Sequence, residues 1–197
     1  MKNNGFVLAE FVIALPLLIL LLFALGEITY KIFSTMYNQA ADYILETEAH
    51  EVLEQISTEA KAAHSAEIKQ AIGGKDIQEI FFNYHVVGNN LSKDYFKKSD
   101  FNSSTADIVD LIYTRRFTVG ATETGGYHVY AERMENGPKK NPISGGNVLG
   151  DTTVTKLKFT STKKLLHIEL EMQSVVTDKK IKVATSVFMP ACEEMKP

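Results

Sequence analysis

The sequence predicts an α+β fold in which a long N-terminal helix packs on a C-terminal antiparallel β-sheet head. An apolar run at the N-terminus is followed by a segment without proline that keeps helical periodicity as far as Gly73-Gly74. Beyond these glycines the apolar residues alternate in steps of two, which is typical of strands. The composition, 45% hydrophobic and 23% charged, is that of a folded protein.

The first element is a polar leader, residues 1–5, and an apolar segment, residues 6–26. About 20 apolar residues in a helix span the hydrocarbon core of a bilayer, so the segment predicts a transmembrane helix. It contains one acid, Glu10. An ionisable side chain at the membrane centre costs roughly 2.5–3.5 kcal/mol, so Glu10 predicts a charged partner, or a place near the headgroups from which it reaches water. Pro16 predicts a helix kink, which membrane helices tolerate.

A cleaved secretory signal is the alternative interpretation of this segment. Ala24-Leu25-Gly26 has the small residues of a signal-peptidase site, and cleavage there makes Glu27 the new N-terminus. Three features favour a retained helix: the apolar run is long for a signal, Lys2 is its one basic flanking side chain, and Glu10 interrupts it.

The second element, residues 27–73, predicts an amphipathic helical stalk. Its apolar residues recur at spacings of three and four, which predicts a buried stripe. They are Leu45, Ala49, Val52, Leu53, Ile56, Ala60, Ala63 and Ile68. Six acids mainly off this stripe predict a solvated face. They are Asp42, Glu46, Glu48, Glu51, Glu54 and Glu59. A helix from Phe6 to about Ile72 would be roughly 100 Å long, with breaks considered at 37–41 and 62–65.

The remaining residues, 74–197, predict a β-rich head. Six segments rich in β-branched and aromatic residues are predicted strands: 79–87, 108–119, 127–134, 153–160, 165–173 and 180–188. The short connections 161–164 and 177–180 predict that the last three strands form an antiparallel meander. Residues 89–106 and 135–151 are predicted loops, the second because of its many turn formers.

No catalytic or metal site is predicted, and no cofactor. The five histidines are scattered over different elements, and Asp100, Asn102 and Ser104 lack the glycine and glutamate that complete a calcium loop. The net charge of −3 and the pI near 6.0 argue against nucleic acid as a partner. Cys192 is the single cysteine, so it forms no intramolecular disulfide, and we expect an inert thiol. These features predict a component of an assembly and not an enzyme.

Gly5, followed by Glu10, resembles the cleavage signature of type IV pilin-like precursors. The longer segment from Glu10 to Glu27 resembles the TadE-like family, which are minor pseudopilins of the tight-adherence (Flp-type) pilus machinery. The shared pattern is an acid, an aromatic residue (Phe11), a small residue, a proline that opens a leucine run (Pro16), and a second glutamate. The resemblance covers roughly the first 40 residues.

This resemblance implies cleavage between Gly5 and Phe6 by a prepilin peptidase on the cytoplasmic side. Phe6 would then carry a new α-amine with a pKa near 8. Glu10 of one subunit would pair with the Phe6 amine of its neighbour, because an unpaired charge in lipid is costly. The implied fold is pilin-like.

The resemblance also implies the partners and the location. The partners are the cytoplasmic membrane, the prepilin peptidase, other pilin or pseudopilin subunits and the pilus assembly platform. The chain would cross the cytoplasmic (inner) membrane once with its head outside, or lie in the pilus fibre, and would serve pilus assembly and cell adhesion.

Three alternatives stay open at this point. A minor pseudopilin of a type II secretion or DNA-uptake system would have the same leader and Glu10. A secreted or signal-anchored surface adhesin or binding protein would have no assembly role. A membrane-tethered enzyme ranks last, because the sequence has no convergent set of catalytic residues.

Overall fold

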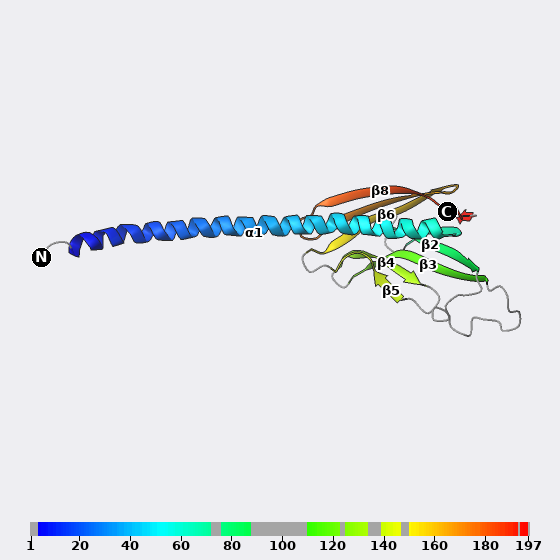
Figure 1. The fold of residues 1–197 in the computed structure, drawn as a ribbon, viewed down its shortest axis with the longest axis horizontal. Helices are drawn as coiled ribbons and strands as arrows, with labels where there is room; N and C mark the ends of the chain where they lie inside the picture. Colours follow the sequence, from blue (N-terminus) through cyan, green and yellow to red (C-terminus); the bar gives the residue numbers. More distant parts are fainter. Residues whose placement is uncertain are drawn as a thin grey trace.

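A computed structural model describes residues 4–71, 76–87, 110–122, 125–133, 139–146, 150–192 and 194–196. One long helix, α1 (Asn4–Ala62), projects from a β-rich head, which we define as residues 64–196 (Figure 1). The predicted α+β class, with a helix packed against antiparallel sheets, is confirmed. The strands are β1 (Ser65–Gln70), β2 (Gln78–Val87), β3 (Asp110–Ala121), β4 (Tyr127–Arg133), β5 (Lys139–Pro142), β6 (Thr152–Thr162), β7 (Leu165–Ser174), β8 (Lys180–Phe188) and β9 (Glu194–Lys196).

The described strands form two sheets. The larger has the order β5-β4-β3-β2-β1-β9, in which β1 and β9 run parallel and all other neighbours run antiparallel. The smaller is the antiparallel meander β6-β7-β8, as predicted from its short connections. The amide of Leu157 in β6 donates to the carbonyl oxygen of Asp76, just before β2, at 3.0 Å, which joins the two sheets through their backbones.

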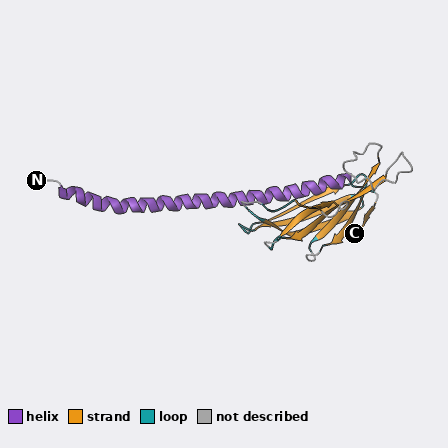
Figure 2. Ribbon diagram, turned by 90° about the horizontal axis from the view of Figure 1, so that it is seen from below, coloured by secondary structure: helices purple, strands orange, loops and turns teal. Residues whose placement is uncertain are grey.

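The C-terminal part of α1 packs mainly against β7 and β8 and also contacts β2, while the two sheets contact each other directly through β6, which lies against β2 and β4 (Figure 1). Seen from below, it runs along one side of the strands (Figure 2). The predicted apolar stripe is buried as far as Ala63. Alternate residues of β7 supply the facing side chains, because successive residues in a strand point to opposite faces. The fully buried apolar residues of these two elements are Ala41, Leu45, Ala49, Val52, Ile56 and Ala60 in α1 and Leu166, Ile168, Leu170 and Met172 in β7.

The helix ends earlier than the sequence predicted. We expected it to continue to about Ile72, but residues 65–70, including Ile68, form β1. The amide of Ala63 bonds the carbonyl of Ala60, which tightens the last turn, and the amide of His64 then donates to the carbonyl of Asn83 in β2 at 2.9 Å. Pairing of β1 with β2 and β9 therefore outweighs the helical preference of this segment.

The predicted loop at 135–151 is also corrected in part. Residues 139–142 form β5, which pairs with the end of β4, and Ile143 continues the pairing by donating to the carbonyl of Val129 at 2.8 Å. Pro142 fits here because β5 is an edge strand, where a missing N–H costs little. The other predicted loop, 89–106, lies outside the described residues.

Candidate functional site: the exposed part of α1

Half of α1 is not covered by the head. Every side chain from Glu10 to Gln39 is exposed, a length of about 30 residues or roughly 45 Å at 1.5 Å per residue. This part includes an 18-residue window with a mean hydropathy of 2.7, none of which is buried. Among the described residues, α1 is the one helix long and apolar enough to cross a membrane.

The predicted site residues lie at the start of this exposed part. Gly5 and Phe6 lie in the first turns of α1, and their side chains are outside those the structure describes. Glu10 lies about one turn after Phe6, and its side chain is exposed. Ile28 follows Glu10 by about five turns, so the two share one line on the helix surface. Pairing of Glu10 with a neighbouring Phe6 amine stays a prediction.

The helix continues through Pro16 without a break. A proline inside a helix removes the hydrogen bond to the carbonyl four residues earlier, here that of Val12. The N-terminal part of α1 follows a gentle curve in Figure 2. Any kink at Pro16 therefore leaves the helix continuous.

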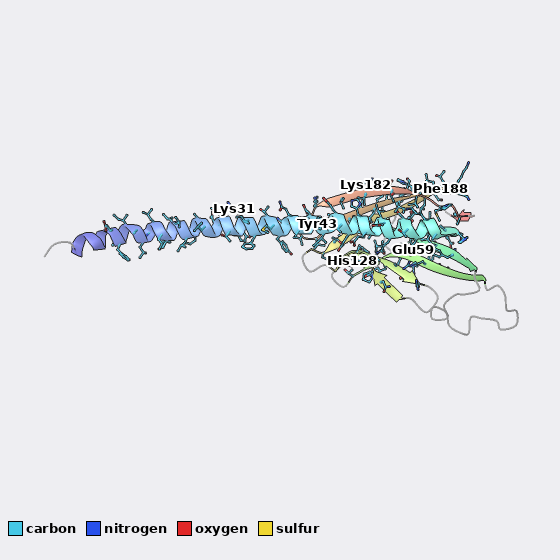
Figure 3. The ribbon with its side chains drawn as sticks, in the orientation of Figure 1. Lys31, Tyr43, Glu59, His128, Lys182 and Phe188 are labelled. Atoms are coloured by element: carbon cyan, nitrogen blue, oxygen red, sulfur yellow. The ribbon has the colours of Figure 1, made fainter. Side chains whose placement is uncertain are left out.

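Between the candidate membrane span, residues 6–26, which we call the membrane segment, and the head lies a stretch that we call the stem, residues Glu27–Gln39. One side of the stem is polar. This side lies in line with the buried apolar stripe of α1, because its residues precede Ala41 and Leu45 at spacings of three and four. These polar residues are Glu27, Lys31, Ser34 and Asn38. Lys31 on the stem is labelled in Figure 3.

The opposite side of the stem is apolar and points away from the head. Its large side chains are more than two-fifths exposed. They are Ile28, Ile32, Phe33, Met36 and Tyr37, and Tyr43 continues the same side one turn into the head region. The hydroxyls of Thr29 and Thr35 donate to the carbonyls of Leu25 and Lys31, both at 2.8 Å. Their O–H donors are therefore already satisfied within the helix.

Acidic side chains of α1 attach the head at the end nearest the stem. Thr177, in the turn after β7, donates to Asp42 at 2.7 Å, and the ammonium of Lys179 lies 3.3 Å from Asp42 and 3.1 Å from Glu46. The hydrogen bond from Thr177, and then the charge of Lys179, hold the pKa of Asp42 below its usual value. Hydrogen bonds to Glu46 and Asp42 raise the pKa of Lys179.

Glu48 attaches the segment between β5 and β6. Its carboxylate is 7% exposed and accepts hydrogen bonds from the Gly145 amide at 2.9 Å and the Thr152 hydroxyl at 2.5 Å. Gly145 has φ of +77° and lies so close to His128 that a β-carbon would come within 2.1 Å of the imidazole. A glycine is therefore required where this segment meets the helix.

Glu59 attaches the head near the end of α1 (Figure 3). It pairs with Arg115 of β3 and accepts a hydrogen bond from the Tyr84 hydroxyl at 2.5 Å. Burial lowers the pKa of Arg115, and the nearby charge of Arg133 adds to this effect. The guanidinium is therefore partly desolvated at the junction of the helix and the larger sheet.

These contacts correct one sequence prediction. Asp42, Glu48 and Glu59 were expected on a solvated face, but each bonds to the head. A signal was present, because Glu48 and Glu59 each follow a stripe residue, Leu45 or Ile56, by three positions. The other acids of this set, Glu46, Glu51 and Glu54, are exposed as expected.

The larger sheet holds a second charged cluster. Arg116 of β3 lies 2.9 Å and 2.5 Å from a carboxylate oxygen of Glu79 and 3.2 Å from one of Glu132. Because these pairs join β2, β3 and β4, they favour the register of the sheet. In the described part of the chain, no three His, Cys, Asp or Glu side chains are grouped to hold a metal ion, and Cys192 is buried. Asp100, Asn102 and Ser104 are outside that part.

Comparisons with known proteins found no family model, no curated protein and no solved structure that matches this chain. What the chain does is therefore inferred from its own residues and their geometry.

Proposed function

We propose that this protein is a TadE-like minor pseudopilin that serves assembly of a tight-adherence (Flp/type IV) pilus. In this proposal the chain is cleaved after Gly5, is anchored in the cytoplasmic membrane by residues 6–26, and holds its head outside. The observation that carries the proposal is the apolar side of α1, which continues past the membrane on the side opposite the head.

The length of the exposed helix supports this proposal. A helix that enters the hydrocarbon core at Phe6 leaves it after about 20 residues, near Leu25. The headgroup layer adds roughly 5–7 Å, which ends near Tyr30. Ile32, Phe33 and Met36 lie beyond that layer and are 54%, 67% and 59% exposed. Lipid does not cover these side chains, and burying the rest of each would contribute about 1–2 kcal/mol. A neighbouring helix is the natural cover.

The side on which these residues lie also supports assembly. The head and the polar residues of the stem lie on the same side of α1. Partner helices can therefore contact the apolar side of the stem without meeting the head. Glu10 shares its line on the helix with Ile28, which belongs to the apolar side. A helix that covers the stem would therefore also meet Glu10.

The charge of Glu10 gives the contact its specificity in this proposal. A carboxylate within the hydrocarbon costs roughly 2.5–3.5 kcal/mol, and a cationic partner offsets that cost. Cleavage after Gly5 would create such a partner, the α-amine of Phe6, about 6 Å along the axis from Glu10. A subunit shifted axially by about one turn would bring its own amine to the Glu10 of its neighbour.

The competing functions differ in what they need from α1. A signal-anchored adhesin needs a membrane span but no large apolar side chains beyond the headgroups. A pseudopilin of a type II secretion or DNA-uptake system would use the same helix geometry. The leucine block that follows Pro16 favours the tight-adherence type over these systems.

The mass and N-terminal residue of the protein from native membranes test the proposal. We expect Phe6 as the first residue and retention of the whole apolar helix. A chain that starts at Glu27 would be a secreted protein, and a chain that keeps its leader would not be processed as a pilin. Either result contradicts the proposal.

The role of Glu10 is tested by Glu10→Ala, with Glu27→Ala as the matched control. We expect Glu10→Ala to lower incorporation into the assembled pilus fraction at least about tenfold, because its pairing would be worth more than 1.4 kcal/mol. Glu27→Ala, at the membrane edge, should have a small effect. Normal piliation and incorporation of Glu10→Ala would contradict the assigned role.

A further inference from the structure

The head carries charge of opposite sign on two surfaces that point away from each other. One is the exposed side of α1 within the head, and the other is the outer face of the three-stranded sheet β6-β7-β8. Because α1 packs on the inner face of this sheet, against β7 and β8, its own exposed side and the outer face of the sheet look in different directions.

The exposed side of α1 is acidic along the head. Glu46, Glu51 and Glu54 are exposed there, with Lys61 as the one exposed cation of this stretch. Glu46 is paired with Lys179 of the same chain. Glu51 and Glu54 make no ion pair or hydrogen bond with any residue that the structure describes. Two acids therefore face outward without a counter-charge from the described part of the chain.

A groove follows these acids along α1. It consists of two hollows of about 400 and 460 Å³ that share Glu51 and Gln55. The first is bounded by Tyr43, which is labelled in Figure 3, and by residues 142–145 after β5, and the second extends to Glu59 and Arg115. From Tyr43 to Glu59 the groove is roughly 24 Å long. Side chains from another chain could enter it beside Glu51 and Glu54.

The outer face of β6-β7-β8 is basic. Its outward charged residues are Lys156 and Lys158 in β6, Glu169 and Glu171 in β7, and Lys180 and Lys182 in β8.

The two glutamates of this face are already neutralised. Lys156 lies 3.0 Å from Glu169, and Lys182, labelled in Figure 3, lies 3.4 Å from Glu171. Lys158 and Lys180 make no ion pair with the described residues and are exposed. The face therefore keeps two positive charges, which match the two unpaired acids of α1 in number and are opposite in sign.

We propose that the basic face of β6-β7-β8 of one copy docks on the acidic side of α1 of a second copy. The proposal rests on the membrane anchor of the proposed function, which makes the helices of two copies parallel. Parallel copies cannot pair one surface with itself through a two-fold axis in the membrane plane, but they can join unlike surfaces head to tail. Such a contact leaves one acidic and one basic surface free at the ends, so further copies can add.

Charge reversal in the full chain tests this proposal. One variant carries Glu51→Lys and Glu54→Lys, and the other carries Lys158→Glu and Lys180→Glu. Copies in native membranes are linked with an amine- and carboxylate-reactive zero-length reagent and with a longer cysteine-reactive reagent between Gln55→Cys on α1 and Ala184→Cys on β8, both at exposed positions. Each variant alone should lose at least about tenfold in linked product, because two attractive pairs become repulsive. Co-expression of the two variants should restore it, because each then offers the surface that the other needs.

Three controls keep the result specific: a charge reversal elsewhere on the head, the salt dependence and the thermal stability of the variants. Glu67→Lys, which reverses a partly exposed acid of β1 that pairs with Lys69, should leave the cysteine-linked product unchanged. Raising salt from 50 to 500 mM should reduce that product. The thermal unfolding of each variant should match the parent, since all four substituted side chains are exposed. Failure of co-expression to restore linking, or linking that ignores the reversals, would overturn the proposal.

This outcome is separable from that of the proposed function. The N-terminal residue is read by mass on the same samples. A chain that begins at Phe6 and shows no charge-dependent linking overturns the contact between copies and leaves the pseudopilin proposal intact. A chain that links as expected but begins at Glu27 contradicts the pseudopilin proposal.

Discussion

The two halves of α1 have the same helical period but carry their apolar side chains on opposite sides of the helix. From Ala41 to Ala63, the residues of one stripe are buried against the head. From Glu27 to Asn38, the same stripe is polar, and the large apolar side chains other than Tyr30 lie away from this stripe, toward the opposite side. The polarity of the helix therefore inverts where the head begins.

This inversion separates two tasks within one continuous helix. The head-bound half supplies part of the core of the protein, so its substitution should affect folding. The stem and membrane segment contribute no side chain to that core, so their substitution should affect contacts with lipid or other chains. Three comparisons of variants and one labelling experiment test this division of α1.

The largest expected effect is on stability. Ile56→Ala removes a fully buried side chain between α1 and the sheets, and we expect it to lower the free energy of unfolding of the head by about 2–5 kcal/mol. Ile32→Ala, the matched change on the stem, should stay within about 0.5 kcal/mol. Chemical denaturation of the detergent-solubilised full chain measures both. Equal losses for the two variants would contradict the division of α1.

A smaller effect is expected for two glutamates one turn apart. Glu48→Ala leaves the Gly145 amide and the Thr152 hydroxyl without their acceptor, and should cost about 1–3 kcal/mol. Glu51→Ala, which changes an exposed side chain, should cost less than about 0.5 kcal/mol. The same denaturation series compares them. A loss for Glu51→Ala as large as that for Glu48→Ala would show that Glu48 does not hold the segment before β6.

The smallest effect is the pH dependence of the attachment at Asp42. The pKa of Asp42 is lowered in the folded protein, so its contribution to stability is present above the unfolded value near 3.9 and is lost as the pH falls through the lower folded value. We expect Asp42→Asn to be less stable than the parent at pH 7, with the difference shrinking below pH 4. A difference that grows on acidification would have the wrong sign.

Local patterns in the sequence were sufficient for most elements. The content of β-branched and aromatic residues located β2, β3, β4, β6, β7 and β8, with alternation of apolar residues in the last three, and the spacing of Leu45, Val52 and Ile56 identified the buried side of α1. Both patterns reflect burial on one face, which a periodic sequence records directly.

The features that sequence reasoning missed depend on distant partners. The segment Ser65–Gln70 became a strand because β2 and β9 pair with it, and β9 is at the other end of the chain. Glu48 is buried by Gly145, which is 97 positions away, and Asp42 is held by Thr177, 135 positions away. No local pattern specifies such pairs, although the position of Glu48 next to the stripe was a partial signal.

The inverted stem was also within reach of the sequence. Ile32, Phe33 and Met36 recur at helical spacing, and the predicted stripe from Leu45 already marked the side of α1 that the head covers. Comparing the two sets of residues places the apolar side chains of the stem on the opposite side. The structure thus shows how the apolar side of the stem is oriented: it faces away from the head.

The most direct test of the central claim is the accessibility of the stem in native membranes. Single cysteines at Met36 and Ser34 lie on opposite sides of the same stretch, and the native Cys192 is buried and serves as the background. If the apolar side of the stem is covered by other subunits, a membrane-impermeant maleimide should label Ser34→Cys several-fold faster than Met36→Cys. In purified monomer the two rates should become similar. Equal labelling in native membranes would contradict the claim.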